Sequence, residues 1–125
     1  MSETRQRREI LKILDTRGKH MTVERVFEET QKNFPHIAIG TVYRNLNKLA
    51  DNGEIRRLFF HGDPVRFDRN TAPHQHKYCV KCHSVADIED IDKATISELT
   101  GSCAEIVDYD FCVYIVCENC AGGKE

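Results

Sequence analysis

The 125-residue sequence lacks any long apolar run. No stretch approaches the roughly 20 consecutive apolar residues of a membrane helix, and the polar first nine residues lack the apolar segment of a signal peptide. Internal repeats and low-complexity segments are also missing. We therefore expect a folded cytoplasmic protein with no membrane partner. Thiols stay reduced in the cytosol, so the six cysteines favour metal binding over a disulfide framework.

The small net charge of −2 hides an asymmetry along the chain. Residues 1–69 carry 14 Lys and Arg against 10 Asp and Glu, whereas residues 70–125 carry 4 against 10. A basic first half and an acidic second half indicate two domains, the first facing a polyanion, although chance clustering of charge is the alternative. Residues 70–73 read as a short linker between a domain over 1–69 and a second over 74–125.

The first half has the order of a winged helix. Apolar residues at helical spacing predict helices over 6–16, from the N-cap Thr22 to Phe34-Pro35, and over 38–52. Residues 54–60 and 65–68 are separated by a turn and read as a β-hairpin. In a winged helix the third helix enters the DNA major groove and the hairpin flanks the backbone.

The third helix is expected to have a buried and an exposed face. Val42, Leu46 and Leu49 form the buried stripe, and Gly53 supplies the left-handed residue after the helix. Arginines elsewhere would meet phosphates, with a solvated helix face as the alternative for those near the N-terminus. The residues expected to contact DNA are Arg5, Arg7, Arg8, Thr41, Tyr43, Arg44, Asn45, Lys48, Arg56 and Arg57.

The second half is predicted to form a β-β-α-β unit. Strands are expected over 77–80 and 84–88, and a helix capped by Asp90 over about 91–100. Apolar residues at every odd position from 107 to 115 predict a long strand with one buried face. A unit of about 50 residues has a small core, so it needs a zinc ion, a partner subunit or both. The predicted fold class is thus α+β.

Two Cys-x-x-Cys pairs lie 34 residues apart. Such pairs are typical of a tetrathiolate zinc site, which is structural because its closed shell leaves no open position. A thioredoxin-type redox motif is the competing interpretation, but it gives no reason for a second pair. The four expected zinc ligands are Cys79, Cys82, Cys117 and Cys120. Cys103 and Cys112 are expected to be free cysteines.

His74 and His76 are one residue apart on an extended segment, so their side chains point to the same side. Asp68, Asp87 and His20 are candidates to complete a metal shell with them. Such a mixed nitrogen and oxygen shell suits Fe²⁺ or Mn²⁺, or zinc less selectively. The alternative is a solvated loop histidine and plain surface carboxylates.

Several motifs, taken together and in order, resemble the ferric uptake regulator family of metal-dependent repressors. They are Thr4-x-Gln6-Arg7, Phe34-Pro35, Thr41-Val42-Tyr43-Arg44-Asn45-Leu46, Arg66-Phe67-Asp68, His74-x-His76 and the two Cys-x-x-Cys pairs. The sequence looks most like the peroxide-sensing branch, which implies a regulatory metal on His20, Asp68, His74, His76 and Asp87.

The resemblance implies a homodimer that binds operator DNA when Fe²⁺ or Mn²⁺ is bound. Peroxide would inactivate the iron form by oxidising His20 or His74. A zinc-, iron- or manganese-responsive uptake repressor is the alternative within the family. A metalloenzyme is not expected, because no general base with a neighbouring nucleophile is apparent, and a zinc-containing interaction module is the third option.

The sequence also departs from the family pattern. Iron-uptake members typically read His-His-Asp-His around the histidine pair and have a further histidine on the last strand. Here the region reads Pro73-His74-Gln75-His76, and Tyr109 occupies the strand position. Many members begin with an extra helix before the Thr-x-Gln-Arg motif, whereas in this sequence the motif begins at Thr4.

Overall fold

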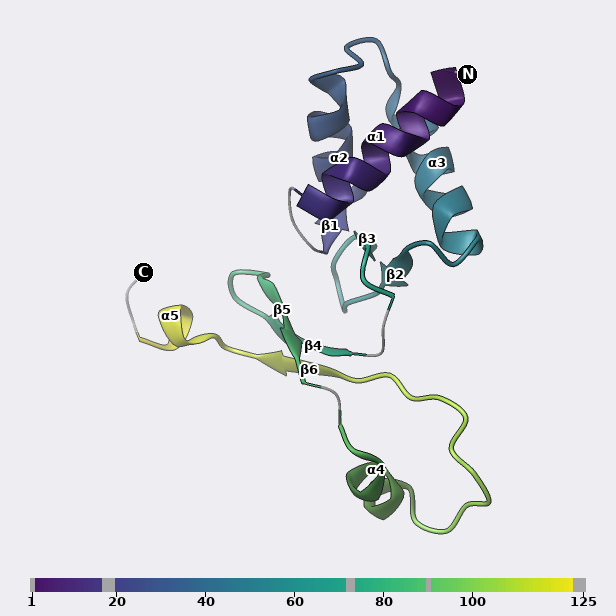
Figure 1. Cartoon of the computed structure of the whole chain (residues 1–125). Coiled ribbons are helices and arrows are strands. Elements are labelled where there is room, and N and C mark those ends of the chain that lie inside the picture. The colour runs from purple at the N-terminus through teal and green to yellow at the C-terminus, as the bar shows by residue number, and fades with distance from the viewer. Residues whose placement is uncertain (1, 17–19, 72–73, 90, 123–125) are drawn as a thin grey trace. The chain divides into compact units, whose positions relative to one another are not determined.

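The computed structural model describes residues 2–16, 20–71, 74–89 and 91–122 (Figure 1). The chain forms two compact units, Met1–Thr71 and Ala72–Glu125. Both helices and strands are present, and none of the helices in the described ranges is long and apolar enough to cross a bilayer.

The first unit is a winged helix, as predicted. Its three helices pack with a small antiparallel sheet of strand order β1-β3-β2, in which β1 lies between α1 and α2 in the chain and β2 and β3 follow α3. The elements are α1 (Ser2–Thr16), β1 (Met21–Thr22), α2 (Val23–Gln31), α3 (Ile39–Asp51), β2 (Arg56–Leu58) and β3 (Arg66–Asp68). Strand β1 was not predicted, because two residues carry no readable alternation. α1 begins earlier than the predicted residue 6, and the predicted stop at 17–19 lies outside the described residues.

Apolar stripes on the three helices enclose the core of this unit. Ile10 of α1, Val26 of α2, and Val42 and Leu46 of α3 are completely buried around Phe67 of the central strand. The Thr22 hydroxyl accepts the Arg25 backbone N–H at 3.2 Å, which confirms it as the N-cap of α2. Gly53 follows α3 with a φ of +79°, as predicted.

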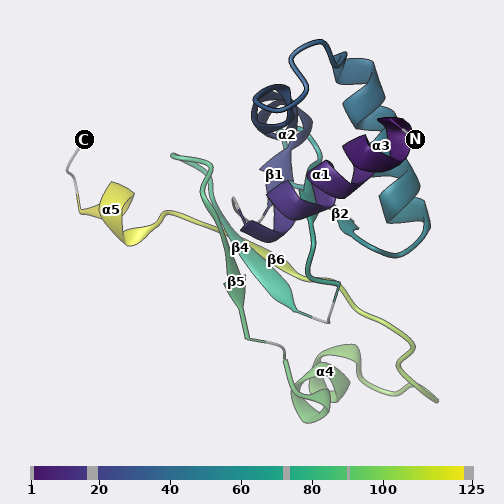
Figure 2. The same ribbon diagram turned by 45° about the horizontal axis from the view of Figure 1, so that its top comes forward.

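The second unit has the predicted β-β-α-β order. Strand β4 is central, pairing antiparallel with β5 and parallel with β6, and α4 lies in the crossover between β5 and β6. The elements are β4 (Gln75–Cys79), β5 (Val85–Ile88), α4 (Lys93–Thr100), β6 (Cys112–Ile115) and α5 (Glu118–Ala121). In both views α4 stands away from the sheet at the end of a long irregular segment (Figures 1 and 2).

Two predictions for this unit are corrected. The long strand over 107–115 is wrong: only Cys112–Ile115 pairs, and Val107 is 87% exposed. Alternation of apolar residues does not provide a neighbouring strand, and β4 begins only at Gln75, opposite Phe111 in the register. The helix begins at Lys93, and Asp92 caps it by accepting the Thr95 N–H at 2.9 Å. The predicted cap Asp90 lies outside the described residues.

Candidate metal centres and nucleic-acid interface

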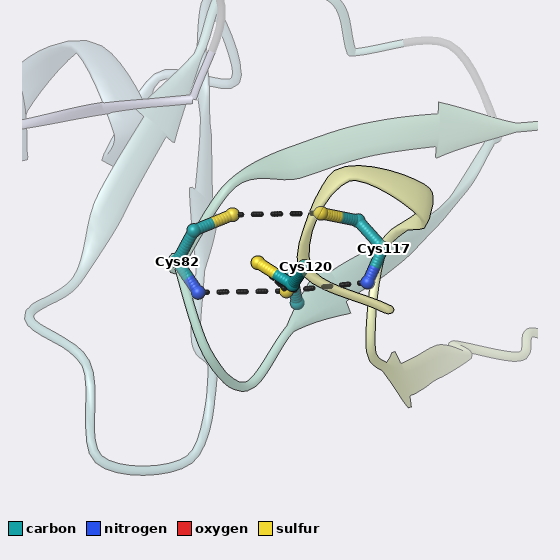
Figure 3. Close-up of side chains that lie close together, drawn as sticks. Cys82, Cys117 and Cys120 are labelled. Carbon is teal, nitrogen blue, oxygen red and sulfur yellow. Dashed lines mark hydrogen bonds between the residues drawn. The ribbon is translucent and has the colours of Figure 1, made fainter. Parts of the chain in front are cut away.

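The four paired cysteines converge at one point of the second unit. Their sulfur atoms all lie within 4.8 Å of one another. The Sγ atoms of Cys82 and Cys117 are 3.7 Å apart (Figure 3). Those of Cys79 and Cys120 are 3.8 Å apart. A tetrahedron with Zn–S bonds of about 2.3 Å has sulfur–sulfur edges of about 3.8 Å. The cluster therefore fits a closed tetrathiolate zinc site.

The local fold explains how these thiols meet. Cys79 ends β4 and Cys82 lies in the turn toward β5, while Cys117 is the N-cap residue of α5 and Cys120 lies within that helix. The first pair thus lies between two antiparallel strands rather than at the strand-to-helix turn that a thioredoxin-type motif requires. Zinc on all four thiols ties the start of the unit to its end.

Neighbouring groups shift the pKa values of Cys79, Cys82 and Cys120 in different directions. The backbone N–H groups of Cys82 and Cys117 each donate to the Cys79 sulfur at 3.4 Å, and they lower the pKa of Cys79 to about 5. The Ser84 hydroxyl, 3.2 Å from the Cys82 sulfur, lowers the pKa of Cys82. The neighbouring Cys117 sulfur raises the pKa of Cys120 to about 12. Backbone N–H groups thus favour the thiolate form of Cys79, whereas the neighbouring sulfur favours the protonated form of Cys120.

The other two cysteines lie outside this cluster. Cys103 is exposed, with its sulfur 3.7 Å from the Thr100 hydroxyl. Cys112 is half-buried at the start of β6, and burial raises its pKa.

In the first unit, His20 and Asp68 are brought together by strand β1. The pair Met21↔Phe67 in the antiparallel β1–β3 register places the residue before Met21 beside the residue after Phe67. His20 is 7% exposed and Asp68 1%, and His20 Nε2 lies 3.6 Å from Asp68 Oδ2. Both are therefore buried donors of the types that a metal ion accepts.

The backbone of His20 is in an unusual conformation. Its φ of +61° lies in the left-handed region, which is costly for a residue with a side chain. The Arg66 guanidinium donates to the His20 carbonyl at 3.4 Å, and the Asn70 N–H donates to Asp68 Oδ1 at 3.0 Å. Strain held by surrounding bonds is typical of functional positions. Sequence analysis found His20 and Asp68 but missed these two supporting groups.

In the second unit, His74, His76 and Asp87 form a second donor set. Cross-strand pairing sets His76 opposite Asp87, and His74 lies just before β4. Asp87 Oδ1 is 3.4 Å from His74 Nε2 and 3.5 Å from His76 Nε2, and the two imidazole centroids are 4.6 Å apart. Two imidazoles facing one carboxylate at these distances fit around a single cation.

The four thiols, on the one hand, and the histidines and aspartates, on the other, have donor chemistry that agrees with the predicted cofactors. Four thiols suit structural zinc, and imidazoles with carboxylates suit Fe²⁺ or Mn²⁺. Each unit by itself brings together its own share of the predicted regulatory ligands. The complete five-residue site draws on both units and stays a prediction.

Helix α3 carries half of the residues predicted to contact DNA. Tyr43 is 47% exposed, and Arg44 and Lys48 are exposed. Arg44 donates to the half-buried Thr41 hydroxyl at 3.2 Å. On α1, Arg5 and Arg8 are exposed and Arg7 is half-buried. This distribution leaves cations on the surfaces of both helices.

Asn45, which was expected to contact DNA from the exposed face of α3, is buried instead. Its side chain is 1% exposed, and its amide donates to the Thr41 carbonyl at 3.0 Å. Asn45 follows Val42 by three positions, so it belongs to the buried stripe. Arg57 is half-buried and donates to Asn47 Oδ1 at 3.1 Å and to Asp51 Oδ1 at 2.9 Å. Its guanidinium therefore already has partners on α3.

The arrangement of units and donor sets can be compared with known proteins. The sequence profile of the Ferric uptake regulator family matches residues 1–114. This chain belongs to that family. The family is one of metal-responsive transcriptional regulators rather than enzymes, in agreement with the expected metal-dependent repressor.

Three relatives show how similar this chain is to other proteins of the family. The peroxide-responsive repressor PerR of Staphylococcus aureus is 29% identical over 122 residues, covering 94% of this chain and 80% of the relative. The Campylobacter jejuni peroxide stress regulator is 27% identical with a TM-score of 0.76, covering 95% of this chain and 91% of its own. The Francisella tularensis ferric uptake regulator, solved with iron, is 29% identical with a TM-score of 0.77, covering 93% and 91%.

Proposed function

We propose that this family member is a repressor that binds operator DNA as a homodimer when Fe²⁺ or Mn²⁺ occupies its regulatory site, and that peroxide inactivates the iron form. Zinc on the four paired cysteines would hold the second unit together. The proposed ligands of the regulatory metal are His20, Asp68, His74, His76 and Asp87.

The division of these ligands between the two units carries the proposal. The first unit supplies one imidazole and one carboxylate, and the second supplies two imidazoles and one carboxylate. Neither set alone fills the shell that Fe²⁺ or Mn²⁺ takes. If the five residues bind one ion together, they select one orientation of the first unit relative to the second. Metal binding and DNA binding are then coupled, and the coupling is reciprocal.

The first unit would read the operator. The exposed residues Tyr43, Arg44 and Lys48 of α3 suit contacts with base edges and phosphates of the major groove. Arg5 and Arg8 of α1 suit phosphates, which makes the affinity depend on salt concentration. We retain Thr41, Arg7 and Arg57 as proposed supporting contacts and leave out Asn45, which is buried.

The second unit would form the dimer. Among the residues of this unit that the structure describes, the buried apolar ones are Tyr78, Cys79 and Ile96. Leu99 is 67% exposed, Val107 87% and Val113 48%. Exposed apolar residues beside so small a core favour a protein partner. A second copy of the chain fits because two-fold dimers read two half-sites at a spacing fixed by the DNA helix.

Relatives named for peroxide support the sensing step. When bound, Fe²⁺ supplies electrons that activate peroxide. One oxygen of the peroxide would then be inserted into a ring C–H bond of His20 or His74, and the other would leave as water. The imidazole is oxidised by two electrons and the peroxide is reduced by two, so the step balances. An oxidised imidazole is a weaker ligand, so the site would release its cation and the repressor its operator.

Operator binding with Mn²⁺ or Fe²⁺, before and after peroxide, tests the proposal. The operator can be selected from a random duplex pool with the Mn²⁺-loaded protein. We expect peroxide to abolish binding of the iron-loaded protein only, with mass spectrometry locating one added oxygen atom on His20 or His74. Binding that does not depend on either metal would refute the proposal.

An uptake repressor without peroxide sensing is the second candidate. The Francisella tularensis ferric uptake regulator supports it, because its identity of 29% equals that of the peroxide-responsive relative. Iron-loaded protein that keeps its operator after peroxide, with unmodified histidines, would establish this alternative.

A further inference from the structure

Gln75 lies between the two histidines of the second unit and is almost as buried as they are. It is the first residue of β4 and is 3% exposed. A buried amide must form hydrogen bonds, so its partner shows what it holds in place. Its Oε1 accepts the backbone N–H of Phe111 at 2.7 Å.

This side-chain bond takes the place of the next main-chain hydrogen bond at the end of the β4–β6 pair. Along the parallel β4–β6 pair, His76 N donates to Phe111 O at 3.4 Å and Val80 N to Ile115 O at 2.8 Å. Continuing that regular pattern would bring the Phe111 N–H to the main-chain carbonyl of residue 74. The Gln75 side chain accepts it at the end of the pair, so both peptide groups of Phe111 are bound by the residues 75 and 76 of the histidine motif.

From Phe111 the contacts continue to helix α4. The rings of Phe111 and Tyr109 form an edge-to-face pair with centroids 6.0 Å apart. The Tyr109 hydroxyl donates to the Ile91 carbonyl at 3.1 Å, directly before Asp92, the N-cap of α4. Most residues between α4 and Tyr109 are exposed. Gln75 is therefore the first in a series of contacts, through Phe111 and Tyr109, that hold the irregular segment between α4 and β6 in place.

We propose that Gln75 is the positioning residue of the His74–His76 pair. This inference rests on the proposed function, because it takes the pair as regulatory metal ligands. Without the Gln75 acceptor, the Phe111 N–H loses its partner. The bond from the His76 N–H to the Phe111 carbonyl is then left to hold the first residues of β4, and His74 just before them, beside the start of β6. The metal would then have to order the two rings on binding, and its affinity falls. Groups that orient metal ligands commonly change affinity by about 10–100-fold when they are removed.

The test compares substitutions that remove or keep the acceptor. Gln75→Leu removes it at similar volume, Gln75→Asn shortens it by one methylene, and Gln75→Glu keeps an oxygen within reach. Lys77→Gln, at an exposed position of the same strand, is the matched control. In the zinc-loaded, Mn²⁺-free protein, hydrogen exchange of the Phe111 amide is measured first. Mn²⁺ affinity is then measured from the electron paramagnetic resonance signal of free Mn²⁺, with zinc content determined in parallel.

We expect faster exchange of the Phe111 amide and about 10-fold weaker Mn²⁺ binding in the leucine and asparagine variants, with zinc retained. The glutamate variant and the Lys77 control should keep wild-type protection of Phe111. Unchanged Mn²⁺ affinity in both loss variants would overturn the inference. So would parallel loss of zinc and Mn²⁺ in both, since that pattern marks a merely structural role. A wild-type protein that binds zinc but no Mn²⁺ would instead refute the proposed function itself.

Discussion

Replacing His20 by asparagine should separate metal response from folding. His20 is buried, lies 3.6 Å from Asp68 and has a φ of +61°. Asparagine tolerates the left-handed region better than most residues, so His20→Asn removes the imidazole while keeping the backbone. His20→Ala removes the same ring but leaves a side chain that the left-handed region disfavours. Both variants therefore lack the His20 imidazole, and they differ in the backbone strain at this position.

The expected magnitudes follow from these two effects. Coupling between an effector and a ligand is typically about 5–150-fold in affinity, and we expect Mn²⁺ to raise operator affinity within that range. Without the imidazole of the first unit, the ratio of affinities with and without Mn²⁺ should fall to roughly one in both variants. Left-handed strain at alanine costs about 1 kcal/mol. For the unit Met1–Thr71 this lowers the unfolding midpoint by roughly 4–8 °C relative to the asparagine variant.

Fluorescence anisotropy of a labelled operator, titrated at fixed salt with and without Mn²⁺, measures the ratio. Thermal unfolding of the same preparations measures the strain. His36→Asn, at an exposed histidine between α2 and α3, is the control and should keep the wild-type ratio. A His20→Asn variant that stays folded and still binds its operator in a Mn²⁺-dependent way would refute the two-unit site.

Three further outcomes follow from the structure. Cys120→Ser should abolish zinc binding and unfold the second unit, whereas Cys103→Ser should leave zinc content unchanged, as atomic absorption and circular dichroism can show. Zinc affinity should rise between about pH 6 and 8, because binding removes the proton of Cys120. Since the Cys79 thiol is already ionised in this pH range, chelator competition should show that fewer than four protons are released per zinc ion. Asn45→Ala should lower the free energy of unfolding by about 1 kcal/mol without changing the salt dependence of operator binding. Lys48→Ala should lower the slope of log affinity against log salt concentration by about one.

Local patterns predicted the parts of the fold that depend on neighbouring residues in the chain. The spacing of Val42, Leu46 and Leu49 determined which face of α3 is buried, because helical periodicity repeats within a few residues. The two Cys-x-x-Cys pairs likewise indicated their shared site, since each spacing already brings two thiols to one side of a turn. These predictions needed no information about distant contacts.

The features that sequence analysis missed depend on contacts distant in the chain. Alternation over 107–115 showed which residues share a face but not that β4 begins too late in the register to pair with residues 107–110. Asn45 is the exception: it was predicted to contact DNA, although local periodicity already places it three positions after Val42, in the buried stripe. The support of His20 by Arg66 spans 46 positions and depends on β1, a strand of two residues. Short-range patterns carry no signal for such a contact.

The two donor sets differ in a way that suits them to different roles. All four thiols belong to one unit and join its first strand to its last helix, so a metal there stabilises that unit whatever the rest of the chain does. The imidazoles and carboxylates are divided between the units, and they are harder donors that bind Fe²⁺ or Mn²⁺ more reversibly than thiolates bind zinc. Only an ion bound across both units can change their relative orientation when it leaves. In the proposed mechanism the signal must therefore act on the histidines and aspartates, and the zinc site must stay closed while it does.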